Sequence, residues 1–120
     1  MTPTNMLLFD HKLAVPEPGA PAADRIVEGS PRNTTWNLYE SEDGKTYSGI
    51  WESTPGAWRI IYDEWEFCHI VSGISIISDE DGNEITVKAG DAFTLAPGFR
   101  GIWKVVETTR KHYVIELPRG

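Results

Sequence analysis

The side chains best suited to chemistry lie in the stretch YDEWEFCHIVSG, which runs from Tyr62 to Gly73. Positions 62–69 hold three carboxylates, a phenol, a thiol and an imidazole. Carboxylates and imidazoles are common metal ligands, and a carboxylate beside a phenol can supply a general base and a general acid. The stretch therefore suggests either a metal site or a metal-free binding or catalytic site.

Strand geometry separates these side chains into two sets. In a β-strand, successive side chains point to opposite faces, so residues two apart share a face. Glu66 then shares a face with Tyr62, Glu64 and Cys68. His69 lies three residues from Glu66 and points to the other face. We therefore expect His69 to be absent from any site centred on Glu66.

The elements that must position these residues are predicted to be short β-strands. From Thr35 onward, β-prone runs alternate with Gly- and Asp-rich breaks, which is typical of an all-β sandwich or barrel. Gly73 reads as one such break, and the runs GIWKVVE and KHYVIEL read as separate strands. Asp-Gly steps predict tight turns at 41–44 and 79–82, and the Pro-Gly step at 96–98 predicts a third turn.

The N-terminal part of the chain has a different composition. Residues 10–35 contain four prolines and several Gly and Ala, a mixture that disfavours both helices and paired strands. We expect residues 1–34 to form an extended arm that packs on the barrel or on a partner subunit. Residues 35–120 are expected to form the barrel domain.

Composition excludes several classes of function. The length of 120 residues fits one domain, and the net charge of -7 predicts that nucleic acid is not a partner. No apolar run approaches the roughly 20 residues that span a bilayer, and the N-terminus lacks the features of a signal peptide, so we expect a cytoplasmic protein without a membrane partner. Cys68 is the single cysteine, which excludes an intramolecular disulfide and a multi-cysteine zinc site.

Two motifs together resemble those of the cupin superfamily. In the first, six residues separate Glu66 from Gly73; in the second, AGDAFTLAPG places Gly90 seven positions before Pro97. The segment 49–116 is similar to the small single-domain cupins grouped with the cupin domain of ureidoglycine aminohydrolase. This resemblance implies a cupin double-stranded β-helix, which is a jelly-roll barrel, often dimeric, with a pocket near one mouth.

The resemblance also implies a divalent metal, held by two His and a Glu of the first motif and a His of the second. Only Glu66 matches one of these ligands. The preceding positions 59–62 read RIIY, and positions 98–103 after the second motif read GFRGIW, without a His. We therefore predict that the usual metal site is missing and that no cofactor is needed. A looser divalent metal site built from carboxylates stays open as an alternative.

Lys111 is the natural counter-ion of Glu66, because the resemblance implies that the strand RKHYVI returns across the barrel. Glu66, Tyr62 and Lys111 are the candidate catalytic residues. Trp103 follows the Pro-Gly turn at the place where other cupins put their last ligand, so we expect it to line the cavity. The candidate ligand-binding residues are Trp103, Glu64, Trp58 and Cys68. A structural ion pair and core-filling aromatic side chains stay open as alternatives.

Three functions fit these observations. The first is binding of a small, polar metabolite inside the barrel without the usual metal. The second is a small enzyme, a hydrolase, lyase or isomerase of nitrogen or amino-acid metabolism, with or without a metal, in which Glu66 or Glu64 acts as the base and Tyr62 as the acid. The third is an accessory or structural domain that forms a homodimer through its N-terminal arm.

Overall fold

The structure, a computed structural model, describes residues 5–118. Residues 1–4 of the expected arm and 119–120 of the expected barrel domain lie outside the described residues. No helix in the described part of the chain is long and apolar enough to cross a membrane. The elements are η1 (His11–Leu13), β1 (Glu17–Gly19), η2 (Ala23–Arg25), β2 (Ile26–Glu28), β3 (Asn33–Glu40), β4 (Thr46–Ser53), β5 (Gly56–Ile61), β6 (Trp65–Asp79), β7 (Glu84–Lys88), β8 (Ala92–Leu95) and β9 (Arg100–Glu116).

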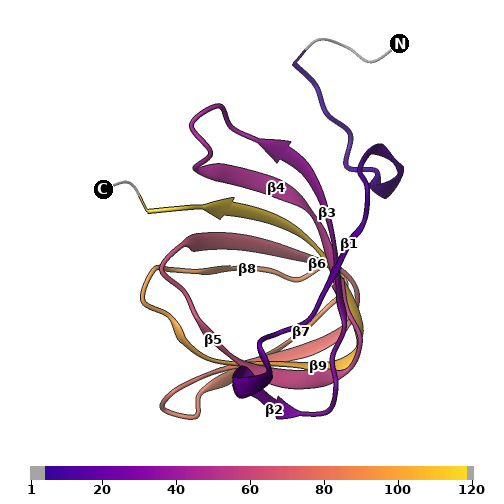
Figure 1. Cartoon of the computed structure of the whole chain (residues 1–120). Helices are drawn as coiled ribbons and strands as arrows, with labels where there is room; N and C mark the ends of the chain where they lie inside the picture. The colour runs from indigo at the N-terminus through magenta and orange to yellow at the C-terminus, as the bar shows by residue number, and fades with distance from the viewer. Residues whose placement is uncertain (1–4, 119–120) are drawn as a thin grey trace.

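The strands form one antiparallel sheet that curls into a barrel, as Figure 1 shows. β9 lies at its centre: its first half pairs with β5, its second half with β4, and its other edge with β6 along nearly its whole length. β6 pairs in addition with β7 and β8. The predicted all-β jelly-roll barrel with an extended N-terminal arm is confirmed.

β6 and β9 are long, bent strands where the sequence predicted breaks. Gly73 lies inside β6 with φ +89°, and a Cβ at this position would overlap the carbonyl oxygen of Thr108 on β9. Only glycine fits where the two strands cross so closely. The register shifts between residues 70 and 75, so positions 66, 68 and 70 are buried before the bend and positions 75 and 77 after it. The predicted break at Gly73 was wrong, and so was the separation of β9 into two strands.

The three predicted turns are confirmed. Residues 41–44 join β3 to β4, and the Gly44 N–H donates to the carbonyl oxygen of Ser41 at 2.9 Å. Residues 79–82 join β6 to β7, and residues 96–98 lie between β8 and β9. Asp-Gly and Pro-Gly steps supply the backbone conformations that such turns need.

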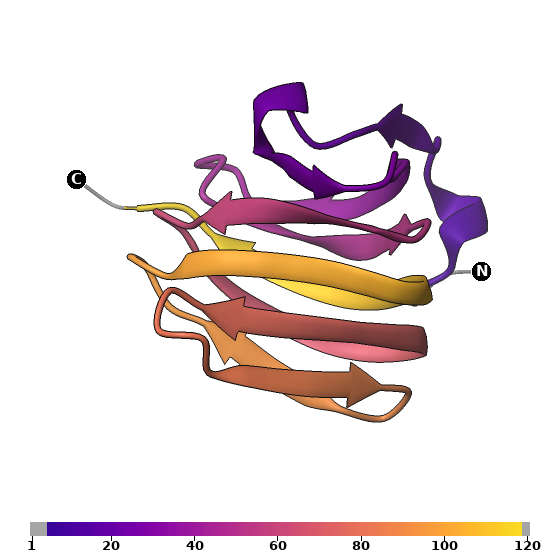
Figure 2. The same cartoon turned by 90° about the horizontal axis from the view of Figure 1, so that it is seen from below.

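The N-terminal segment is extended, as predicted, and lies along one side of the barrel (Figures 1 and 2). It nevertheless contains two paired strands that its composition disfavoured: β1 pairs with β3, and β2 pairs with β5. Each is three residues long, and β1 itself contains Pro18, which an edge strand tolerates because one of its sides has no partner strand. Through β1 the segment brings Glu17 to the edge of the barrel interior.

The apolar core fills one end of the barrel. It gathers side chains from β5, β6, β7, β8 and the first half of β9. Its buried members are Trp58, Ile60, Cys68, Ile70, Ile77, Val87, Leu95, Trp103 and Val105. Because the core occupies only this end, the other end of the barrel is free to form a polar pocket.

Candidate functional site

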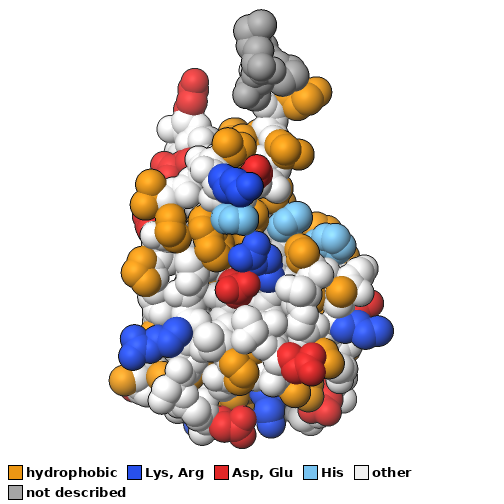
Figure 3. Space-filling model, turned by 90° about the vertical axis from the view of Figure 1, so that its right-hand side faces the viewer, with side chains coloured by type: hydrophobic (Ala, Val, Ile, Leu, Met, Phe, Trp, Pro, Cys, Tyr) orange, Lys and Arg blue, Asp and Glu red, His pale blue; other side chains and the backbone are white. Residues whose placement is uncertain are grey.

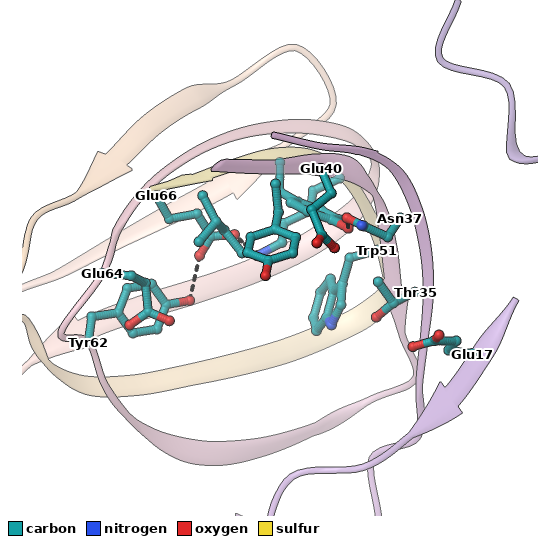
Figure 4. A pocket seen from close by; sticks show the side chains of 12 residues that line it. Glu17, Thr35, Asn37, Glu40, Trp51, Tyr62, Glu64 and Glu66 are labelled. Carbon is teal, nitrogen blue, oxygen red and sulfur yellow. Dashed lines mark hydrogen bonds and ion pairs between the residues drawn. The ribbon is translucent and has the colours of Figure 1, made fainter. Parts of the chain in front are cut away.

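A pocket of about 480 Å³ opens at the polar end of the barrel. Its walls come from β1, β3, β4, β6, β9 and the connection between β5 and β6, as Figure 4 shows. The lining residues are Glu17, Thr35, Asn37, Glu40, Tyr47, Trp51, Tyr62, Glu64, Glu66, Lys111, Tyr113 and Ile115. The pocket therefore contains all three candidate catalytic residues and Glu64.

Glu66 and Lys111 form a buried ion pair in the wall of the pocket. The Lys111 Nζ donates to Glu66 Oε2 at 2.8 Å, and the two residues are only 5% and 2% exposed. In the strand register Lys111 lies opposite Ile70, so its long side chain reaches along β6 to Glu66. Burial is the largest single influence on the pKa of Lys111 and lowers it, but Glu66 and Cys68 together raise it, and the net direction is upward. Lys111 is thus a fixed, charged ammonium group.

Two indole rings complete the surroundings of this ammonium group. Nζ of Lys111 lies 4.6 Å from the ring centroid of Trp51 and 4.4 Å from that of Trp103. The ring faces carry partial negative charge and stabilise a desolvated cation. The sequence predicted the partnership of Glu66 and Lys111, and the structure brings the two side chains together as expected.

Tyr62 forms a hydrogen bond with the second carboxylate oxygen of Glu66. Its hydroxyl donates to Glu66 Oε1 at 2.6 Å (Figure 4). Burial, together with the negative charge of Glu66, raises the pKa of Tyr62 well above its ordinary value, so the phenol stays protonated and keeps donating. Both carboxylate oxygens of Glu66 are therefore occupied by protein donors.

Three of the expected ligand-binding residues lie beneath the pocket, in the core. Trp103 is 1% exposed, and its Nε1–H donates to Ser75 Oγ at 3.2 Å, which fixes the indole away from the cavity. Trp58 and Cys68 belong to the same apolar cluster. Burial raises the pKa of Cys68 to about 12, more than the nearby Lys111 lowers it, so the group stays a thiol. The structure does not place these three residues on the lining of the pocket.

Trp51 provides the indole of the pocket wall in place of Trp103. Its position opposite Lys111 in the pairing of β4 with β9 could not be read from the sequence, because the register was unknown. Tyr113 was also missed as a lining residue, and its hydroxyl donates to Asn37 Oδ1 at 2.7 Å. Its even spacing from Lys111 was a usable signal, because residues two apart in a strand share a face.

His69 lies away from this site, as strand alternation predicted. It pairs in register with His112, and their ring centroids are 6.0 Å apart in a second, largely apolar pocket. The ring of Phe9 packs edge-on against His112 at 5.1 Å. Figure 3 shows histidine and hydrophobic side chains gathered on this face of the molecule.

The donors in the polar pocket do not fit the divalent metal that the jelly-roll resemblance implies. Within residues 5–118, no group of three His, Cys, Asp or Glu side chains is placed to hold a metal ion. Glu66, the one residue that matches a ligand position, instead accepts from a phenol and an ammonium group. A cation 2.8 Å from that carboxylate would repel an incoming dication. We therefore assign no metal to this site.

A curled antiparallel jelly roll with a pocket at one end of the barrel is typical of cupins. Residues 40–113 match the family described as the EutQ-like cupin domain, and the chain belongs to that family. None of the curated proteins matches the chain. The narrower resemblance to the ureidoglycine aminohydrolase group stays a prediction.

Solved structures from bacteria share the fold. A DUF861-family protein of unknown function from Pseudomonas syringae is 27% identical with a TM-score of 0.79, over 89% of this chain and 46% of its own. This chain thus spans about half the length of that relative. A DUF861-family protein from Thermotoga maritima is 39% identical with a TM-score of 0.52, over 53% of this chain and 73% of its own. The EutQ protein of Clostridium difficile is 19% identical with a TM-score of 0.65, over 82% and 73% of the two chains, which shows the fold alone.

Proposed function

We propose that this cupin domain binds a small, polar metabolite in the pocket at the open end of its barrel, without the usual cupin metal. The observation that carries the proposal is the buried pair of Glu66 and Lys111 in the wall of an open cavity of about 480 Å³. Small-molecule sites commonly have volumes of about 300–1,000 Å³ and combine aromatic walls with a few polar groups. This pocket has both features.

The ion pair organises the pocket. The charges of Glu66 and Lys111 compensate each other, and Tyr62 satisfies the remaining carboxylate oxygen. A buried pair of this kind seldom adds net stability compared with apolar residues of similar size, so its presence is better explained by a role in the site. It keeps Tyr62, Trp51 and the strands that carry them in one arrangement around the cavity.

Blocking the cavity tests this proposal. Thr35 lines the pocket, and Thr35→Trp would place an indole in it; Thr86→Trp makes the same change on β7, outside the pocket. A panel of amino acids, amines and carboxylic acids would be screened by thermal shift against the wild-type protein. We expect at least one compound to raise the Tm of the wild type and of Thr86→Trp but not that of Thr35→Trp. Equal shifts in both variants, or no shift with any compound, would overturn the proposal.

Catalysis is a second candidate, favoured by the 2.6 Å hydrogen bond between Tyr62 and Glu66. A protonated phenol beside a carboxylate has the composition of a general acid and base pair. Each oxygen of Glu66 accepts one hydrogen bond from the protein, so a lone pair on each oxygen is left to accept a proton from a substrate. Once a substrate is known, full activity of Glu66→Gln would exclude Glu66 as the base, and Glu64 would then be the remaining candidate.

A homodimer formed through the N-terminal segment is favoured by the apolar side chains exposed there. Met6, Leu8, Leu13 and Val15 are all exposed, while Phe9 packs on His112 of the same chain. A second copy of the chain could cover these side chains. Replacing Leu8 and Leu13 by Ser should then shift the elution of the protein from dimer to monomer on a sizing column, and unchanged elution would contradict the dimer.

A further inference from the structure

We propose that the ligand of the polar pocket is a small organic cation, such as a primary or quaternary amine. This inference rests on the proposed function, because it specifies the class of ligand for the same pocket. The sequence predicted only a small, polar metabolite. The distribution of charge in the structure specifies the class of that metabolite.

The one ammonium group in the described lining of the pocket already interacts with protein groups. Lys111 is the single cationic side chain among the described lining residues. Its Nζ donates to Glu66 at 2.8 Å and to Cys68 Sγ at 3.7 Å, and it lies over the rings of Trp51 and Trp103. An ammonium group has three N–H donors and no acceptor, so little capacity remains for an anionic ligand. With an exposure of 5%, it is also poorly accessible from the cavity.

The carboxylates that remain are not compensated. Glu17, Glu40 and Glu64 line the pocket, and none of them forms an ion pair with another described residue. Four lining carboxylates against one ammonium give the pocket a formal charge of -3. Figure 4 shows Glu64 beside Tyr62 on one side of the cavity and Glu17 on the opposite side, with Glu40 between them. A cation inside the pocket would be attracted from several directions.

The walls between these carboxylates are aromatic. Tyr47, Trp51, Tyr62 and Tyr113 all line the cavity. Aromatic faces attract ammonium groups and accommodate their methyl or methylene substituents, whereas they offer little to a carboxylate ligand. The net charge of -7 on the whole chain adds a long-range field of the same sign. Charge and wall chemistry therefore favour the same class of ligand.

Three probes that share one ring and differ in charge test this inference. Benzylammonium is cationic, benzoate anionic and benzyl alcohol neutral at pH 7. Each would be titrated into the full-length protein, with the indole N–H signal of Trp51 followed by NMR and assigned with Trp51→Phe. We expect benzylammonium to bind at least ten times more tightly than benzoate, with benzyl alcohol between them. The preference should weaken as salt screens the carboxylates.

Two matched variants locate the effect. Glu64→Gln removes a lining carboxylate, and Glu84→Gln makes the same change at an exposed position on β7, outside the pocket. We expect Glu64→Gln to weaken benzylammonium binding by about two- to fivefold and Glu84→Gln to leave it unchanged. Benzyl alcohol should bind both variants as it binds the wild type.

The outcomes separate this inference from the proposed function. If benzoate binds as tightly as benzylammonium or more tightly, the ligand class is wrong while the pocket remains a binding site. Equal weakening by Glu64→Gln and Glu84→Gln also overturns the ligand class, because a general surface field would then explain the preference. If none of the three probes moves the Trp51 signal, the proposed binding function and the inference both fail.

Discussion

The two ends of the barrel interior are built on the same strands but filled in opposite ways. At one end, β6 and β9 contribute Ile77, Trp103 and Val105 to a packed apolar core. At the other end, the same two strands contribute Glu66, Lys111 and Tyr113 to an open pocket. The fold alone therefore does not determine where a cavity forms; the inward-facing side chains of each half decide it.

This contrast separates two sources of stability. At the apolar end, each side chain contributes through the area that it buries and the space that it fills. At the polar end, the groups stabilise the protein only as a set, because a buried charge without its partner is strongly unfavourable. Single substitutions should therefore change the free energy of unfolding in different ways at the two ends. The difference should be larger in double variants, in which a second substitution is added at the polar end.

The largest effect is expected from Lys111→Met. It leaves the Glu66 carboxylate buried without its counter-ion, so we expect the free energy of unfolding to fall by about 3–5 kcal/mol in urea titrations. Adding Glu66→Gln should restore more than half of the loss, because the remaining side chain is neutral. A double variant that is no more stable than Lys111→Met would show that Lys111 contributes by packing, as residues at the apolar end do.

Ile77→Ala probes the apolar end. Ile77 is buried in the core, and its truncation should cost about 2–5 kcal/mol through lost burial and the resulting cavity. When Ile77→Ala is combined with Glu66→Gln, the two losses in the free energy of unfolding should add, since the two sites share no partner. Benzylammonium binding by folded Ile77→Ala should match the wild type. A changed affinity would mean that the two ends are coupled.

Tyr62→Phe has a smaller effect because it removes one hydrogen bond and no charge. Losing the donor to Glu66 Oε1 should reduce the free energy of unfolding by about 1.5–3 kcal/mol. Tyr39→Phe, at an exposed position on β3, is the matched control and should change it by less than about 0.5 kcal/mol. Equal effects of the two changes would argue against a strong Tyr62 to Glu66 hydrogen bond.

Alkaline pH should destabilise the protein through the buried thiol of Cys68, which lies in the core beneath the pocket. The pKa of Cys68 is raised to about 12, mainly by burial, so the folded state keeps a proton that the unfolded state releases. Its contribution to stability is complete below the ordinary thiol pKa and is lost as the pH rises toward 12. Between pH 9.5 and 11, Cys68→Ala should reduce the slope of stability against pH by about 1.4 kcal/mol per pH unit. Identical slopes in urea titrations of the two proteins would refute this assignment.

Strand parity placed Glu66 inward and His69 outward, and both positions are confirmed. The partnership of Glu66 with Lys111 was predicted from the resemblance, which implies that the strand carrying Lys111 returns across the barrel. The predicted break at Gly73 was wrong, because this glycine lies in a bend of β6 where the strand crosses closely over β9. In the sequence, the only sign of this close crossing is a glycine. A glycine at a turn would look the same, so the sequence could not distinguish the two.

The pocket lining was predicted only in part for a related reason. Trp51 and Trp103 are both inward-facing tryptophans, and their roles differ because Ser75 binds the indole N–H of Trp103 and holds it in the core. Ser75 lies beyond the bend, where the inward-facing parity has changed. Glu17 reaches the pocket only because β1 pairs with β3, a pairing that the proline-rich composition disfavoured.

The central claim is that an ion pair and an open, ligand-binding pocket stand where other cupins hold a metal. A crystal structure of protein purified without chelator or affinity tag, with anomalous data collected at metal absorption edges, tests it most directly. We predict Lys111 Nζ within hydrogen-bonding distance of Glu66, no anomalous peak beside that carboxylate, and ligand density against Trp51 after soaking with benzylammonium. A metal ion bound to Glu66, or a cavity closed by side chains, would contradict the account.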